Sequence, residues 1–148
     1  MKESGVKIIA LIVILSQVLV FCGKTETDIQ WEEDLQAFWV PVGSDYTIMT
    51  DMPSYEFLDG NRGASYYTSF EQPDSFSWEI KRGQLKIYYD KAPAYYIGYD
   101  KYNSRSLFRI ESFNDNDTIV DLIQFFSSGY QTDFYLVKSD LLYEQDDF

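Results

Sequence analysis

The sequence predicts an all-β protein, an antiparallel meander that closes into an eight-stranded barrel and is preceded by one short N-terminal helix. The clearest observation is the alternation of apolar and polar side chains along residues 76–81 and again along residues 84–89. A half-buried antiparallel strand requires this pattern, because successive side chains point to opposite faces. Arg82-Gly83 separates the two runs, and glycine permits the positive φ of a tight reversal. Residues 76–89 therefore predict a β-hairpin.

The second observation is the regular recurrence of turn-forming residues after Trp39, where helical periodicity ends. The turn residues are Gly60, Pro73, Gly83, Pro93, Asn103, Asp115 and Ser128, at intervals of 13, 10, 10, 10, 12 and 13 residues. This spacing is typical of all-β sandwiches and barrels. The spacers are too short for crossover helices, so neighbouring strands should pair antiparallel. The aromatic content of 18% also favours strands.

Nine short runs are expected to form strands, and the first two count as one bent strand. They are residues 39–42, 55–58, 64–71, 76–81, 84–89, 94–100, 106–113, 119–126 and 132–138. A meander with one apolar face must pack on another layer or close on itself, and only one helix is available. Closure into a barrel is therefore predicted. An eight-stranded barrel has an interior just wide enough for side chains or one small ligand.

The one predicted helix spans residues 28–37. Thr27 and Gln30 have the spacing of a capping box. Trp31, Leu35 and Phe38 recur at helical spacing on one face, and acidic residues fill the other. We expect this helix to cover one end of the sheet.

The composition excludes several classes of function. The chain of 148 residues is expected to form one domain. It has no histidine and a single cysteine, which excludes a Cys-His zinc site, a Cys-His nucleophile and a Ser-His-Asp triad. The net charge of −12 argues against nucleic acid as a partner. No cofactor and no metal site are predicted, and no pair of carboxylates is singled out for catalysis, so we expect a protein that is not an enzyme.

Residues 1–21 are predicted to be a secretory signal. Lys2 and Lys7 precede an apolar stretch, residues 8–21, that is shorter than the roughly 20 residues of a membrane-spanning helix. Cys22 follows directly. Val-Leu-Val-Phe-Cys, residues 18–22, resembles the lipobox of bacterial lipoproteins, which implies that Cys22 is acylated and becomes the mature N-terminus. The alternative is an uncleaved anchor in which Cys22 is an ordinary thiol.

The remaining boundaries follow from this assignment. Residues 22–27 are expected to form a polar tether, residues 28–139 the barrel domain with its helix, and residues 140–148 an acidic tail. A lipidated Cys22 implies export across the inner membrane and anchoring in the cell envelope, with the outer membrane as the expected location. The membrane is then a partner through the lipid. No protein partner follows from the sequence.

Several motifs resemble the lipocalin-like domains of Bacteroidota lipoproteins. They are residues 35–39 (LQAFW) as the tryptophan entry into the first strand, 55–60 (YEFLDG), 78–87 (WEIKRGQLKI), 96–99 (YIGY) and 134–138 (FYLVK) as the closing strand. The resemblance covers about residues 35–138. It implies a barrel with an apolar cavity and no catalytic residues. In that family a basic residue, here Lys138, packs near the entry tryptophan, here Trp39.

A small apolar ligand is the expected partner if the inner wall encloses a cavity. The predicted ligand-binding residues are Trp78, Ile80, Leu85, Ile87, Tyr89, Tyr95, Tyr99 and Phe108. The alternative is a fully packed core, in which case Tyr66, Tyr67, Tyr88 and Tyr96 could stack on sugars or on a partner at the cell envelope. Residues 114–117 (NDND) are expected to form a polar hairpin turn rather than a calcium loop.

Overall fold

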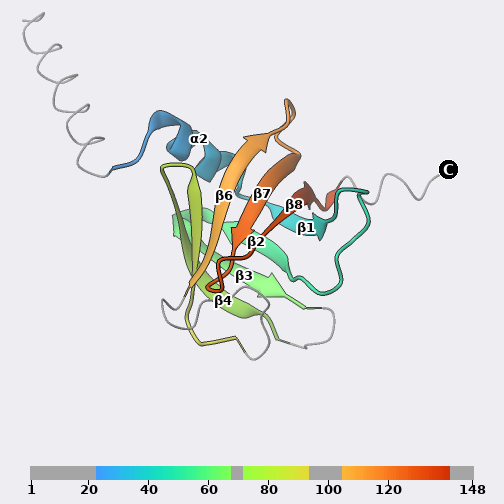
Figure 1. Ribbon diagram of the computed structural model, residues 1–148. Helices are drawn as coiled ribbons and strands as arrows, with labels where there is room; N and C mark the ends of the chain where they lie inside the picture. The colour runs from blue at the N-terminus through green and yellow to red at the C-terminus, as the bar shows by residue number, and fades with distance from the viewer. Residues whose placement is uncertain (1–22, 68–71, 94–104, 141–148) are drawn as a thin grey trace, which may run out of the picture.

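The computed structural model describes residues 23–67, 72–93 and 105–140 of the chain (Figure 1). The predicted signal segment, Cys22, the expected strand at residues 94–100 with Tyr95, Tyr96 and Tyr99, and residues 141–148 of the expected tail lie outside this range. Among the described residues no helix has both the length and the apolar character that crossing a bilayer requires.

The described chain is one helix followed by eight strands that form a closed antiparallel barrel in sequence order (Figure 1). The elements are α2 (Glu26–Asp34), β1 (Phe38–Val42), β2 (Ser54–Leu58), the short 3-10 helix η1 (Asp59–Asn61), β3 (Arg62–Tyr66), β4 (Asp74–Lys81), β5 (Gln84–Tyr89), β6 (Arg105–Phe113), β7 (Ile119–Phe125) and β8 (Gln131–Lys138). The predicted fold class is confirmed. β1 and β2 are separate barrel strands rather than one bent strand, because β1 pairs with both β2 and β8 and so closes the barrel.

The hairpin of β4 and β5 has the predicted register. Six residue pairs run from Phe76↔Tyr89 to Lys81↔Gln84, which leaves Arg82 and Gly83 as a two-residue turn. Both turn residues have positive φ, 53° and 72°, as the type I′ turns of twisted hairpins require. Trp78 is buried on the inner face, whereas Glu79 and Lys86 lie outside and form a long ion pair of 4.0 Å.

The helix differs from the prediction at both ends. It begins after Thr25, because Thr25 and Asp28 form the capping box that Thr27 and Gln30 were expected to form. It ends at Asp34, and Leu35 caps it. Phe38 lies in β1, where its ring packs 5.5 Å from that of Tyr66 rather than continuing the helix face.

The predicted tether at residues 22–27 is wrong for its described part. Lys24 forms an ion pair of 2.5 Å with Glu32, Thr25 caps α2, and Glu26 and Thr27 belong to the helix. The segment is polar and largely exposed, but Lys24 and Thr25 attach it to α2.

Gly63 in β3 marks the closest approach of backbone to the core. A Cβ placed on Gly63 would lie 2.4 Å from Cε2 of Phe76 and 2.5 Å from the carbonyl oxygen of Glu56. Phe76 is fully buried among other rings and cannot withdraw freely. Only glycine fits at this point of the inner wall.

We therefore expect Gly63→Ala to lower the free energy of unfolding by about 1–3 kcal/mol, the usual cost of overpacking a core. Urea denaturation followed by tryptophan fluorescence measures the loss. Gly43→Ala is the control, since its added Cβ would meet only the flexible carboxylate of Asp45 at 3.2 Å. Equal stability of the two variants would contradict the assignment.

Candidate functional site

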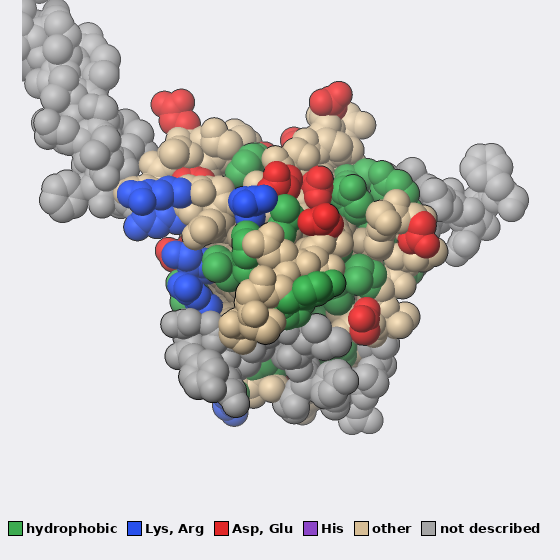
Figure 2. All heavy atoms as spheres, in the orientation of Figure 1, with side chains coloured by type: hydrophobic (Ala, Val, Ile, Leu, Met, Phe, Trp, Pro, Cys, Tyr) green, Lys and Arg blue, Asp and Glu red, His purple; other side chains and the backbone are tan. Residues whose placement is uncertain are grey.

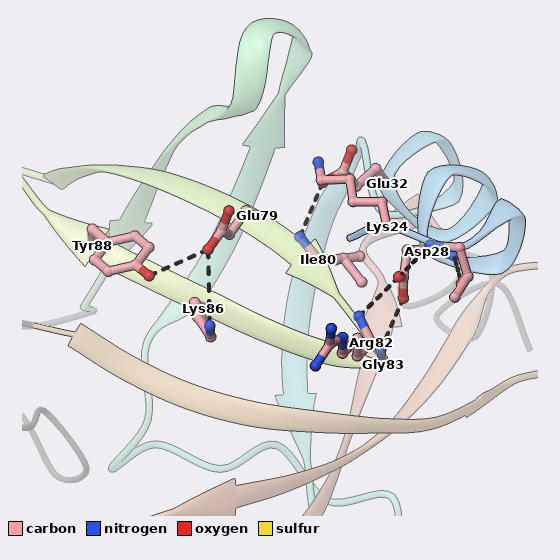
Figure 3. Close-up of polar contacts among 10 residues, drawn as sticks. Lys24, Asp28, Glu32, Glu79, Ile80, Arg82, Gly83, Lys86 and Tyr88 are labelled. Carbon is pink, nitrogen blue, oxygen red and sulfur yellow. Dashed lines mark hydrogen bonds and ion pairs between the residues drawn. The ribbon is translucent and has the colours of Figure 1, made fainter. Parts of the chain in front are cut away.

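One end of the barrel is sealed by the N-terminal turn of α2, which binds the β4–β5 turn through Asp28 (Figure 3). The Asp28 carboxylate accepts hydrogen bonds from the backbone N–H groups of Arg82 and Gly83, each at 2.8 Å. It also accepts one from the N–H of Thr25 at 2.8 Å. Asp28 is only 1% exposed. The helix cap and the hairpin turn therefore share one buried carboxylate.

Burial and hydrogen bonding have opposite effects on the pKa of Asp28. Burial removes water from the carboxylate and raises its pKa, while the backbone N–H groups of Thr25, Gly83 and Arg82 stabilise the ionised form and lower it. The hydrogen bonds prevail, so the pKa of Asp28 lies below its ordinary value. The ionised side chain thus stabilises the folded state.

Two further contacts hold α2 in place. Glu32 accepts a hydrogen bond from the backbone N–H of Ile80 at 3.0 Å (Figure 3). The ring of Trp31 packs 5.8 Å from that of Phe113, between the centroids. The helix therefore covers the ends of β4 and β6, as the sequence predicted for a helix at one end of the sheet.

Trp39 and Lys138 complete the closure of this end. Lys138 Nζ lies 5.3 Å from the centroid of the Trp39 ring, and the indole Nε1–H donates to the carbonyl oxygen of Leu35 at 2.7 Å. Trp39 and Leu35 are fully buried. The Lys138 ammonium group therefore lies within cation–π distance of the Trp39 ring.

The middle of the barrel is an aromatic core. Six of the predicted ligand-binding residues belong to it, all of them buried: Trp78, Ile80, Leu85, Ile87, Tyr89 and Phe108. Edge contacts connect the rings, with centroids 5.2 Å apart for Phe57 and Trp78 and 6.2 Å apart for Tyr55 and Phe108. The structure thus brings these six residues together, and much of their surface is occupied by neighbouring side chains. The predicted residues Tyr95 and Tyr99 lie outside the described residues.

Three buried polar side chains interrupt this apolar wall in the half of the barrel away from α2. Ser65, Ser106 and Gln124 are each at most 1% exposed. Ser65 Oγ, Ser106 Oγ and Gln124 Nε2 have no hydrogen-bond partner within the part of the chain that the structure describes. We call these three residues the polar trio.

Strand register places the polar trio around one ring pair. Ser65 is opposite Tyr55, and Gln124 is opposite Phe108. Ser106 precedes Phe108 by two residues on β6, so both face inward, and Tyr55 and Phe108 meet edge to face. The trio therefore comes from β3, β6 and β7 and converges on the Tyr55–Phe108 contact.

Unpartnered buried polar groups are costly, at about 1–3 kcal/mol each. Proteins hydrogen-bond the large majority of such groups. The sequence analysis missed the trio because it followed apolar residues. The sequence did contain a signal for such residues, because a polar residue can occupy a position that alternation assigns to the inner face. Gln124, two residues after Leu122 and four after Val120 on β7, is an example.

Asp74 lies at the same end of the barrel. It is opposite Ser65 in the β3–β4 register, and burial raises its pKa. A pocket of about 300 Å³ lies beside it, lined by Gln72, Pro73, Asp74, Ser75, Asp90 and Lys91. On the outer side of this pocket Asp90 is bound to Arg62 at 2.5 Å.

A second group of acidic side chains lies on the outer wall of the barrel. Burial raises the pKa of Asp121, and Glu111 and Asp133 raise it further, but these residues lie on the outer wall of β6, β7 and β8. No group of three potential metal ligands occurs among the described residues. Asn114 caps the predicted turn at residues 114–117 by accepting hydrogen bonds from the N–H groups of Thr118 and Ile119.

The predicted outer tyrosines are less available than expected. Tyr66, Tyr67 and Tyr88 are half-buried. Tyr66 donates a hydrogen bond to Glu56 at 2.7 Å and Tyr88 donates one to Glu79 at 3.3 Å. The large exposed apolar side chains of the described residues are Tyr46, Ile48, Leu58 and Tyr130. In the view of Figure 2, basic side chains gather toward the left edge, acidic side chains lie along the top and toward the right, and hydrophobic side chains are scattered between them.

Comparisons of the chain with models of protein families, with curated proteins and with solved structures give no match. The candidate site therefore has to be judged from its own geometry.

The Asp28 contact predicts a pH-dependent stability. Because the folded-state pKa is below the unfolded one, the stabilisation is present above about pH 4 and is lost as the pH falls through the folded-state pKa. We expect Asp28→Asn to lower the unfolding free energy by about 1.5–3 kcal/mol at neutral pH, and by less in acid. Denaturation at several pH values measures this. Glu33→Gln, on the exposed side of α2, should change little, and an equal loss in both variants would contradict the role of Asp28.

Proposed function

We propose that the protein is a lipid-anchored, non-catalytic binding protein that holds a small and mainly apolar molecule in the half of the barrel away from α2. The observation that carries this proposal is the polar trio, three fully buried side chains that each have a polar atom without a hydrogen-bond partner among the described residues. A folded protein rarely leaves such groups unsatisfied, and a bound molecule would supply their partners.

The two ends of the barrel support a single route of entry. Asp28, Trp31, Trp39 and Lys138 fill the α2 end with hydrogen bonds and ring contacts. The pocket beside Asp74 lies at the opposite end of β4. A ligand would therefore enter from the end that carries Asp74.

The lipid anchor is proposed from the lipobox-like residues 18–22. Two or more acyl chains give stable membrane attachment, whereas one gives only marginal binding. Because Thr25 caps α2 and Lys24 is paired with Glu32, an anchor at Cys22 would hold the α2 end close to the membrane. The Asp74 end would then face away from the lipid, in the cell envelope and by expectation at the outer membrane.

A second candidate function is an interaction protein of the envelope with a packed barrel. The exposed side chains of Tyr46 and Ile48 favour it, and Tyr46 stacks on Tyr135 with centroids 5.9 Å apart. Such an aromatic surface is typical of a contact with a protein partner. In this case the barrel would hold no ligand.

Lipidation predicts the behaviour of Cys22→Ala. We expect the wild-type protein expressed in a bacterial host to partition into the detergent phase and to carry acyl chains on its N-terminal peptide by mass spectrometry. Cys22→Ala should lose the acyl chains, and Ser16→Ala, inside the apolar segment, should keep them. A membrane-bound wild-type protein with an unmodified Cys22 would overturn the anchor.

Ligand binding predicts a non-covalent adduct in native mass spectrometry of the full-length protein. Ser106→Phe should remove the adduct, because the new ring would occupy the space beside the trio. Ser127→Phe, in the exposed β7–β8 turn, should retain it. Circular dichroism checks that both variants fold, and Ser106→Leu replaces the larger change if needed. An adduct that persists in the folded Ser106 variants would place the ligand elsewhere, and its absence from every form would favour the packed barrel.

A further inference from the structure

The polar trio also bears on the chemistry of the bound molecule. We propose that the ligand is an uncharged amphiphile whose polar end carries a hydroxyl or an amide group that hydrogen-bonds Gln124, Ser106 and Ser65. This inference rests on the proposed binding function and deepens it. It also modifies the expectation of a purely apolar ligand.

The hydrogen-bonding capacity of the trio defines what the ligand must offer. Gln124 Nε2 only donates, so it needs an acceptor oxygen. The hydroxyl groups of Ser65 and Ser106 donate or accept, so they satisfy either kind of group. A carbonyl or hydroxyl oxygen on the ligand meets the fixed requirement of Gln124, and an amide N–H or hydroxyl proton can bond to a serine.

The charges around the trio disfavour an anionic ligand, and an ammonium group, which only donates, cannot supply the acceptor that Gln124 Nε2 needs. Lys138 packs over Trp39 at the α2 end, and none of the inward-facing residues around the trio is basic among those described. The carboxylate placed beside the trio by strand register is that of Asp74, opposite Ser65. It is an acid, and a carboxylate or phosphate placed beside it would be repelled. An anion at the trio would therefore be buried without a counter-charge, which is strongly unfavourable.

The apolar part of the ligand is accommodated by the rings beside the trio. Tyr55 and Phe108 meet edge to face between the strands that carry Ser65 and Gln124. Phe76 and Tyr89 form a similar contact, with centroids 5.6 Å apart, nearer the Asp74 end of β4 and β5. The site thus combines an aromatic surface with three hydrogen-bonding groups, a combination that matches an amphiphile rather than a hydrocarbon.

A matched ten-carbon series tests the class of ligand. Decanol, decanamide, decanoate and decylamine are added to the full-length protein near neutral pH, and the bound fraction is measured by native mass spectrometry. We expect decanol and decanamide to bind at least tenfold more tightly than decanoate and decylamine. Equal or tighter binding of either charged compound would overturn the inference but leave the binding function standing. A failure of all four compounds, with no native adduct, would overturn both.

Gln124→Leu tests the proposed hydrogen bond between Gln124 and the ligand, because the substitution should weaken binding and raise the stability of the ligand-free protein. The variant should bind decanamide at least tenfold more weakly, because an acceptor loses its donor. Its ligand-free form should melt at a higher temperature, because an unpartnered buried amide is replaced by an apolar side chain. Gln131→Leu, at the exposed start of β8, is the matched control and should change neither value.

The Gln124→Leu experiment can also contradict the inference. Unchanged decanamide binding in Gln124→Leu would show that Gln124 serves the fold alone, whatever the melting temperature, and would overturn the inference. If Gln124→Leu does not fold, Ser106→Ala removes one hydroxyl with a smaller change in volume, and the same two measurements apply. A high-resolution structure of the decanamide complex in which only water contacts the trio would also overturn it.

Discussion

The fold depends on one buried carboxylate. Asp28 accepts the N–H groups of Arg82 and Gly83 in the β4–β5 turn, and it also completes the cap of α2 with Thr25. A turn of this type exposes N–H groups that need acceptors, and a helix N-terminus has the same need. One ionised side chain satisfies both, so the helix is attached to the hairpin that lies in the middle of the sheet. The carbonyl of Gly83 also accepts from the N–H of Ile110 at 2.9 Å, which connects the turn to β6.

This attachment makes the two ends of the barrel unlike each other. At the α2 end, polar groups such as Asp28 and the indole N–H of Trp39 have partners, and aromatic rings fill the space. In the other half, Ser65, Ser106 and Gln124 are buried without partners among the described residues. A barrel stabilised at one end can tolerate unsatisfied groups at the other, because the closed end supplies much of the packing. Under the proposed function, stability and ligand binding would depend on different halves of one sheet.

The predictions that agree with the structure concern interactions between residues that lie close together in the sequence. The β4–β5 hairpin was predicted with its turn and its buried face, because alternation and a two-residue turn are local signals. Closure into a barrel was predicted because the sheet has one apolar face and only one helix is available to cover it. The helix start was placed two residues late, because Thr27-x-x-Gln30 and Thr25-x-x-Asp28 both suit a cap. The carboxylate of Asp28 also binds a turn more than 50 residues away, a contact that local spacing does not contain.

The sequence by itself determined the all-β class, the order of the strands and the inward face of the central hairpin. These are encoded by neighbouring residues, through the period of two and the chemistry of turns. Only the tertiary structure decided that Asp28 binds the β4–β5 turn and that Ser65, Ser106 and Gln124 converge on one ring pair. Residues from β3, β6 and β7 meet there because the sheet closes on itself. A polar residue in phase with a buried strand becomes part of a site only when closure brings the other two beside it.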